Sequence, residues 1–79
     1  MDAQQREFFN TALVKFGASV TDDGLFKKGD RIISSVQIKI IKGRIRFESR
    51  MTGELVMSGP LSSKTITSFV TKFWFWKVK

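Results

Sequence analysis

The sequence predicts a small α+β protein with the element order α-β-β-β-α, in which both helices pack on one face of a three-stranded antiparallel meander. Two observations support this fold class. Apolar and polar residues alternate with a period of two between Val36 and Met57, which is typical of strands with one buried face. The segments on either side carry apolar residues at spacings of three and four, which is typical of amphipathic helices.

The first predicted helix runs from Asp2 to Phe16. Asp2 can cap its first turn while Gln5 reaches back to the Asp2 backbone, as in a capping box. Gly17 can adopt the left-handed conformation that ends a helix. The apolar stripe of this helix, which is expected to cover the meander, consists of Phe8, Phe9, Ala12, Leu13 and Phe16.

The segment from Ala18 to Asp30 is ambiguous. Turn signals at 22–24 and 28–30 flank Leu25 and Phe26, so the sequence predicts either a short strand or an ordered loop between them. The next residues, 31–35, are expected to lead into the first long strand, as its twisted beginning or after a bulge.

The first hairpin of the meander is predicted to turn at Lys42-Gly43, because glycine tolerates positive φ. A two-residue turn there places Ile40 opposite Ile45 and Lys39 opposite Arg46. It also pairs Ile38 with Phe47 and Gln37 with Glu48. Both faces of the hairpin then sort into apolar and polar sides, which supports this register.

The second hairpin is predicted to turn through a three-residue loop, Thr52-Gly53-Glu54. This loop sets Met51 opposite Leu55 and Ser49 opposite Met57. The predicted apolar face of the meander is then Val36, Ile38, Ile40, Ile45, Phe47, Met51, Leu55 and Met57. The predicted opposite face carries Lys39, Arg44, Arg46, Glu48 and Arg50, together with Ile41 and Val56.

Gly59-Pro60 is expected to stop the third strand, and Ser62 or Ser63 can cap a second helix. We assign this helix to residues 63–74. The β-branched residues in it weaken the helical signal, and an extended strand over residues 73–79 is the competing interpretation.

Composition limits the class of protein. Residues 1–79 form a single small basic domain, with 14 Lys and Arg against 7 Asp and Glu and a net charge of +7. No apolar run is long enough to span a membrane and the N-terminus does not resemble a signal peptide, so a cytoplasmic location is expected and a membrane role is not.

Catalysis is not expected, and neither is a cofactor, a metal or a small-molecule substrate. The chain has no histidine and no cysteine, which removes imidazole and thiolate chemistry. Its glycines are scattered and do not form a phosphate-binding loop, and the acidic residues near Asp22 lack the spacing of a calcium-binding loop.

The main functional hypothesis is a nucleic-acid-binding module that uses the basic face of the meander. Guanidinium and ammonium groups on adjacent strands can contact phosphates or guanine edges, and a sheet of this width can enter a major groove. Trp76, in the aromatic C-terminal tail, is an expected interaction anchor. An exposed edge strand leaves room for a dimer formed by sheet extension. The candidate binding residues are Lys39, Lys42, Arg44, Arg46, Arg50 and Trp76.

The predicted element order resembles that of the double-stranded RNA-binding domain, a family in which two helices cover one face of a three-stranded sheet. The resemblance covers element order alone. The family's Gly-Pro-X-His loop corresponds here to Lys42-Gly43, and its lysine cluster corresponds to Lys64 alone, so no functional residue is carried over.

The alternative hypothesis is a compact inhibitor or adaptor, of the kind that phages and mobile elements encode, that binds a host nucleoprotein or transcription complex. Anti-CRISPR proteins are similar to this chain in being very small and free of cofactors. Such a protein would use the basic face or exposed aromatic residues to occupy its target, and would bind free nucleic acid weakly.

Overall fold

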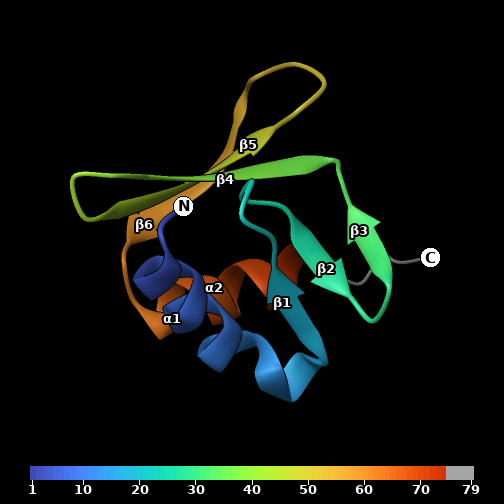
Figure 1. Ribbon diagram of the computed structural model, residues 1–79. Helices are drawn as coiled ribbons and strands as arrows, with labels where there is room; N and C mark the ends of the chain where they lie inside the picture. Colours follow the sequence, from blue (N-terminus) through green and yellow to red (C-terminus); the bar gives the residue numbers. More distant parts are fainter. Residues whose placement is uncertain (75–79) are drawn as a thin grey trace.

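The computed structural model describes residues 1–74 and confirms the α+β class, but it contains two three-stranded antiparallel sheets where the sequence predicts one meander. The elements, shown in Figure 1, are α1 (Ala3–Leu13), β1 (Ala18–Val20), β2 (Phe26–Lys28), β3 (Arg31–Ile33), β4 (Val36–Ile41), β5 (Arg44–Ser49), β6 (Leu55–Pro60) and α2 (Ser63–Phe69). A 3-10 turn, Val14–Phe16, follows α1, and a π-helical turn, Val70–Trp74, follows α2. The three additional strands also remove the match to the element order of the double-stranded RNA-binding domain.

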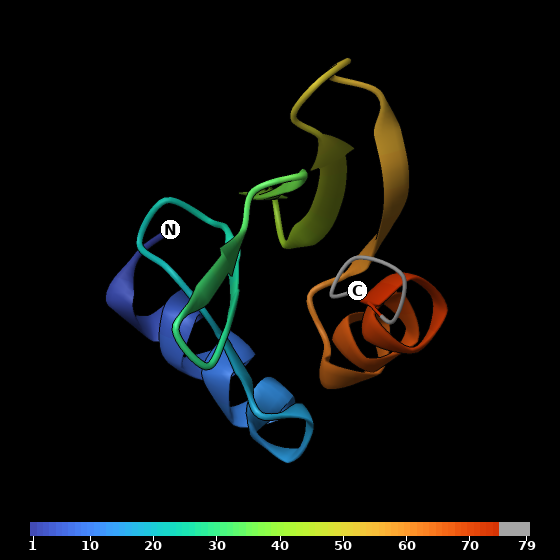
Figure 2. The same ribbon diagram turned by 90° about the vertical axis from the view of Figure 1, so that its right-hand side faces the viewer.

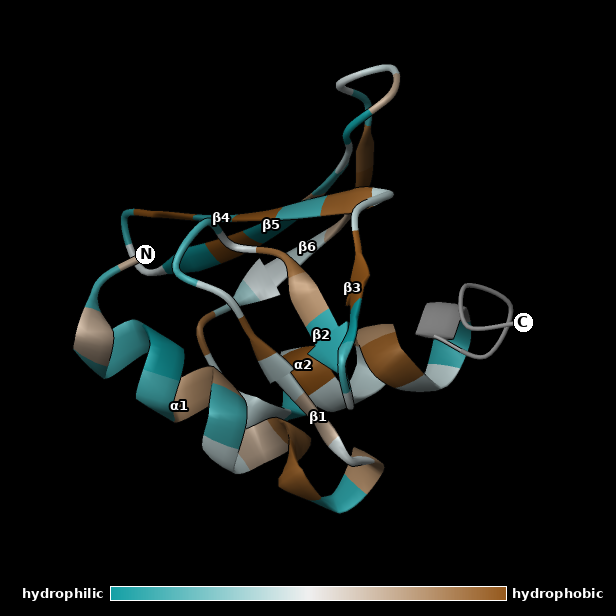
Figure 3. Ribbon diagram, turned by 45° about the vertical axis from the view of Figure 1, so that its right-hand side comes forward, coloured by the Kyte–Doolittle hydropathy of each residue, from teal (hydrophilic) through white to brown (hydrophobic). Residues whose placement is uncertain are grey.

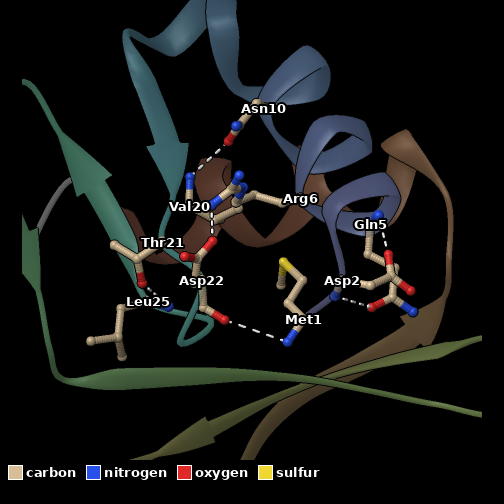
Figure 4. A network of polar contacts seen from close by, with 9 residues as sticks. All are labelled: Met1, Asp2, Gln5, Arg6, Asn10, Val20, Thr21, Asp22 and Leu25. Atoms are coloured by element: carbon tan, nitrogen blue, oxygen red, sulfur yellow. Dashed lines mark hydrogen bonds and ion pairs between the residues drawn. The ribbon is translucent and has the colours of Figure 1, made fainter.

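Helix α1 begins as predicted but ends at Leu13, and the 3-10 turn Val14–Phe16 carries the helical segment on to the predicted stop at Gly17. The Asp2 carboxylate accepts a hydrogen bond from the Gln5 backbone N–H at 2.8 Å, and the Asp2 N–H donates to Gln5 Oε1 at 3.2 Å, which completes the capping box (Figure 4). Gly17 has a φ of 69° and its N–H donates to the Val14 carbonyl. The helical segment thus has a side-chain cap at its start and a glycine cap at the end of its 3-10 turn.

The ambiguous segment, 18–30, forms β1 and β2. Residues 31–33 do not begin the first long strand as predicted, because they form β3, which pairs with β2 in a separate sheet. Val20 lies opposite Phe26, and Phe26 lies opposite Ile33. Each strand has three residues, so the alternation in each is too short to be recognised as a period of two. The Val20 N–H donates to Asn10 Oδ1 at 2.8 Å, which fixes this sheet against α1 (Figure 4).

The hairpin of β4 and β5 has the predicted register. Ile40 pairs with Ile45, Ile38 with Phe47 and Lys39 with Arg46. Lys42 and Gly43 have φ values of 51° and 75°, the positive pair that a type I′ turn requires.

The predicted register of β6 is wrong. Met57 lies opposite Phe47 and Leu55 opposite Glu48, with a bulge between Phe47 and Glu48. Residues 50–54 form a longer loop because the Ser49 N–H donates to the Glu54 carbonyl and the Gly53 N–H to the Ser49 carbonyl. Met51 therefore lies outside the core with 93% of its surface exposed, and Leu55 is 47% exposed.

The core joins both sheets to α2. The Phe47 ring on β5 stacks on that of Phe69 on α2 with a centroid distance of 4.0 Å, and Phe26 on β2 stacks on both rings at 6.2 and 5.4 Å. Figures 1 and 2 show both helices on the same side of the β4–β6 sheet, as predicted, with the β1–β3 sheet sharing that side. The buried core residues are Phe9, Leu13, Ala18, Val20, Phe26, Val36, Ile38, Ile45, Phe47, Ile66, Phe69 and Val70.

Helix α2 begins at the predicted residue. Ser62 caps it, because its hydroxyl oxygen accepts from the Thr65 N–H at 3.3 Å. The helical backbone continues to Trp74 through the π-helical turn, which agrees with the predicted bounds of 63–74. The competing strand assignment falls mainly on residues 75–79, which lie outside the described residues, as does Trp76.

Candidate nucleic-acid interface on the β4–β6 sheet

The outward face of the β4–β6 sheet collects three of the predicted binding residues, Lys39, Arg44 and Arg46, and a fourth, Lys42, lies in the adjoining turn. Strand pairing arranges this face in three cross-strand rows: Ile41, Arg44 and Pro60; Lys39, Arg46 and Ser58; and Gln37, Glu48 and Leu55. Their neighbours Ile38, Ile45 and Phe47 are buried on the other side, so alternation forces these residues outward. Figure 3 shows the alternation of hydropathy along β4 and β5, and Figures 1 and 2 show that no other described helix or strand covers this side.

Glu48 organises the middle of this face. Its carboxylate contacts Lys39 Nζ at 3.2 Å and Arg46 Nε at 2.9 Å. Lys39 and Arg46 lie directly opposite each other, and like charges in that position repel, so Glu48 offsets a repulsion that strand pairing creates. The hydrogen bond from Arg46, followed by the one from Lys39, lowers the pKa of Glu48 below its ordinary value.

Lys42 and Arg44 lie at the hairpin end of the face. Both are exposed, and neither makes an ion pair with any side chain among residues 1–72. Lys42 is also the non-glycine residue with positive φ in the described part of the chain. Two cations at the end of the sheet thus remain available to an anionic partner.

Arg50 lies apart from Lys42 and Arg44. It lies six residues beyond Arg44 on the chain, about 20 Å away at the rise of an extended strand. Its Nη1 donates to the Ser34 carbonyl at 3.4 Å, and its backbone N–H donates to the Ser35 carbonyl. The structure therefore assigns Arg50 to the opposite end of the sheet, beside the β3–β4 connection.

Sequence reasoning gave little weight to the aliphatic part of this face. Ile41 is 50% exposed, Leu55 47% and Val56 37%. The alternation already placed Ile41 and Val56 on the basic side, and Leu55 joins them through the shifted register of β6. The face is therefore a mixed surface of cations and aliphatic side chains.

A second pair of cations, missed by sequence reasoning, flanks the turn between β2 and β3. Lys28 lies opposite Arg31, both are exposed, and neither makes an ion pair among residues 1–72. The two-residue turn Gly29-Asp30 was the available signal in the sequence for a hairpin here. The strands on either side have three residues each, which is too short for a pattern of alternation to reveal them. This pair has the same charge as Lys42 and Arg44 and also lies at the end of a hairpin, so it can serve as a control surface.

The described residues contain no group of three or more His, Cys, Asp or Glu side chains that could hold a metal ion. A shallow hollow of about 270 Å³ lies on the basic face, lined by Gln37, Lys39, Glu48, Ser49, Arg50 and Gly53.

The outer edge of β4 is partly closed, because the Ile38 N–H donates to the Gly24 carbonyl at 2.8 Å. A dimer formed through this edge, which stays a prediction, would have to pair around that contact.

Comparisons of the chain with protein-family models, with curated proteins and with solved structures give no match. Within the described residues, no helix is both long and apolar enough to cross a membrane.

Proposed function

We propose that the protein is a non-catalytic nucleic-acid-binding module whose contact surface is the outward face of β4, β5 and their turn. The proposal depends mainly on one observation: Lys39, Arg44 and Arg46 share this face with one carboxylate, Glu48, and Lys42 lies in the turn that adjoins it. Four cations and one carboxylate leave a local charge of +3. Charge of this density on an open sheet face attracts phosphates.

The backbone at Lys42 gives independent support. A lysine at positive φ is strained, whereas Asn or Gly at that position of a type I′ turn is not. Strain at an exposed position is a reason to expect a role for the side chain. An ammonium group at the tip of the hairpin is well placed to contact a phosphate.

The pairs around Glu48 are also consistent with binding. Lys39 and Arg46 keep 55% and 41% of their side-chain surface exposed while they contact Glu48. Ion pairs at such exposure contribute little to stability, so a phosphate can approach both cations without a large loss. In the absence of a ligand, Glu48 thus stabilises the neighbouring positive charges of Lys39 and Arg46.

The test is a fluorescence anisotropy titration with labelled 20-base-pair DNA, the same duplex as RNA, and a single strand, at 50 and 200 mM KCl. Contacts with about four phosphates predict that affinity falls on the order of a hundredfold between these salt concentrations. We expect a Lys42→Gln/Arg44→Gln variant to lose most of this affinity.

The matched control is Lys28→Gln/Arg31→Gln, which removes the same charge from the β2–β3 hairpin. The proposal requires this control to bind nearly as well as the wild type. Equal losses in both variants would show that net charge alone drives binding, and an absence of salt-dependent binding would reject a nucleic-acid ligand.

The second candidate function is a protein-binding inhibitor or adaptor. It is favoured by the exposed aliphatic residues Ile41, Leu55 and Val56, and by Met51 at the loop between β5 and β6. Arginine and apolar side chains mixed on one face are typical of protein interfaces. Such a protein would show little affinity for the three nucleic acids of the titration, so the same measurement separates the two functions.

A further inference from the structure

We propose that the ligand of this face is duplex DNA, and that the row formed by Ile41 and Arg44 contacts base edges in the major groove. This inference rests on the proposed nucleic-acid function and goes further by naming the duplex and the groove.

The shape of the β4–β5 hairpin fits the major groove of DNA. The end of the β4–β5 hairpin extends past α1 and α2 at the left of Figure 1. Two paired strands are about 5 Å apart, and the major groove of B-form DNA, about 12 Å wide, admits a two-stranded ribbon. The major groove of A-form RNA is too deep and narrow for side chains to reach the bases. A protruding hairpin with outward cations therefore matches DNA better than duplex RNA.

The row at the hairpin end, Ile41 and Arg44, has side chains that match base edges in the major groove. Arg44 and Ile41 are directly opposite each other, so their side chains leave the sheet about 5 Å apart. A guanidinium group can donate two hydrogen bonds to O6 and N7 of guanine, and an aliphatic group can contact the methyl group of thymine. Both features lie in the major groove of DNA, and uracil in RNA lacks the methyl group. A row with one arginine and one half-exposed isoleucine fits this pair of features.

The neighbouring cations complete the arrangement. Lys42 at the turn, and Lys39 with Arg46 in the next row about 7 Å along the strands, can reach phosphates on the two sides of the groove. Single strands are a poorer fit, because proteins that bind them stack bases on aromatic side chains. Within residues 1–72, the outward face of β4–β6 carries no aromatic side chain.

The experiment uses four forms of one 20-base-pair pool whose ten central positions are randomised. They are DNA, RNA, DNA with deoxyuridine in place of thymidine, and DNA with 7-deazaguanine in place of guanine. We expect RNA, and the 7-deazaguanine pool, to bind wild-type protein on the order of tenfold more weakly than unmodified DNA. The deoxyuridine pool should bind about threefold more weakly, since it loses an apolar contact.

Two variants assign these effects to residues. Arg44→Gln should become insensitive to 7-deazaguanine, and Ile41→Ala should become insensitive to deoxyuridine. The control Ile32→Ala removes an isoleucine that is 56% exposed on the other sheet, and should respond to each pool as the wild type does. All three positions are exposed, and circular dichroism of each variant verifies that it folds.

The outcomes separate this inference from the proposed function. Salt-dependent binding that is equal for DNA and RNA, or indifferent to both base analogues, would overturn major-groove recognition and leave nucleic-acid binding intact. Competition by the minor-groove ligand netropsin would also overturn it. An absence of salt-dependent binding to every pool would reject both.

Discussion

At Lys42, the backbone conformation favours another residue type, whereas the proposed phosphate contact requires the lysine side chain. Its φ of 51° is unfavourable for lysine, and asparagine tolerates this conformation better. We predict that Lys42→Asn raises the free energy of unfolding by about 0.5–1 kcal/mol, equal to a few degrees in melting temperature. Urea denaturation followed by circular dichroism measures the change. If Lys42→Asn is instead less stable than the wild type, the turn is not under the strain inferred here.

Glu48 should make the stability of the protein depend on pH. Because Arg46 and Lys39 lower its pKa in the folded state below the ordinary 4.5, the stability that they contribute is complete above about pH 4.5. That stability is lost as the pH falls through the lower folded value. Glu48→Gln removes this titration, so its stability should fall less steeply with acid than that of the wild type.

The measurement is the urea midpoint at intervals between pH 3 and pH 7. Glu54→Gln is the control, since Glu54 makes no ion pair among residues 1–72. Identical acid profiles for Glu48→Gln and the wild type would contradict the inferred coupling of Glu48 to Arg46 and Lys39.

At the scale of elements, the turn between β1 and β2 locks one sheet to the other. Gly24 has a φ of 80°, and its carbonyl accepts from the Ile38 N–H of β4. A Cβ at Gly24 would lie 2.6 Å from the Ile38 carbonyl oxygen, so any side chain must displace the backbone of one sheet. We predict that Gly24→Ala lowers the free energy of unfolding by about 2–4 kcal/mol.

Gly29→Ala is the control for this prediction. Gly29 also has positive φ, at 59°, but a Cβ there would meet no atom within 4 Å. It should therefore cost only the backbone strain, about 1 kcal/mol. Equal urea midpoints for the two variants would show that the contact between the β1–β2 turn and β4 contributes little.

The sequence predicted some elements better than others. The difference arises from the length of each strand and from backbone hydrogen bonds in the loop before β6. Helix α1 has both caps in its sequence, and β4 and β5 have six residues each with regular alternation, so their bounds and register were predictable. Strands β1 to β3 are too short to show a pattern. The register of β6 depends on hydrogen bonds among Ser49, Gly53 and Glu54, which hydrophobic patterning does not reveal.

The same reasoning explains the candidate site. Lys39, Arg44 and Arg46 follow from alternation and Lys42 from the turn, so the sequence was sufficient to group them. The double contact of Glu48 with Lys39 and Arg46 depends on side-chain conformations across the strands, which spacing does not determine. Arg50 continues the alternation in sequence, yet the strand has ended there and the chain has turned into the loop.

Within the described residues, an aromatic stack connects both sheets to α2. Phe26, Phe47 and Phe69 come from β2, β5 and α2, and their rings are within 9° of parallel. Aromatic pairs of this kind contribute beyond the area they bury. Because the stack joins both sheets and a helix, we predict that residues 1–79 unfold in a single cooperative transition.

Phe69→Leu tests this prediction. The ring of Phe69 is 2% exposed, and its loss should lower the free energy of unfolding by about 1–2 kcal/mol, whereas Phe8→Leu, at 39% exposure, should change it by less than about 0.5 kcal/mol. Amide hydrogen exchange then distinguishes two kinds of molecule. If the stack couples the sheets, Phe69→Leu reduces protection in β1–β3 and β4–β6 by the same factor, because both exchange through the same global opening. If β4–β6 loses protection while β1–β3 keeps it, the two sheets are separate cooperative units that the stack holds in contact without making them fold as one.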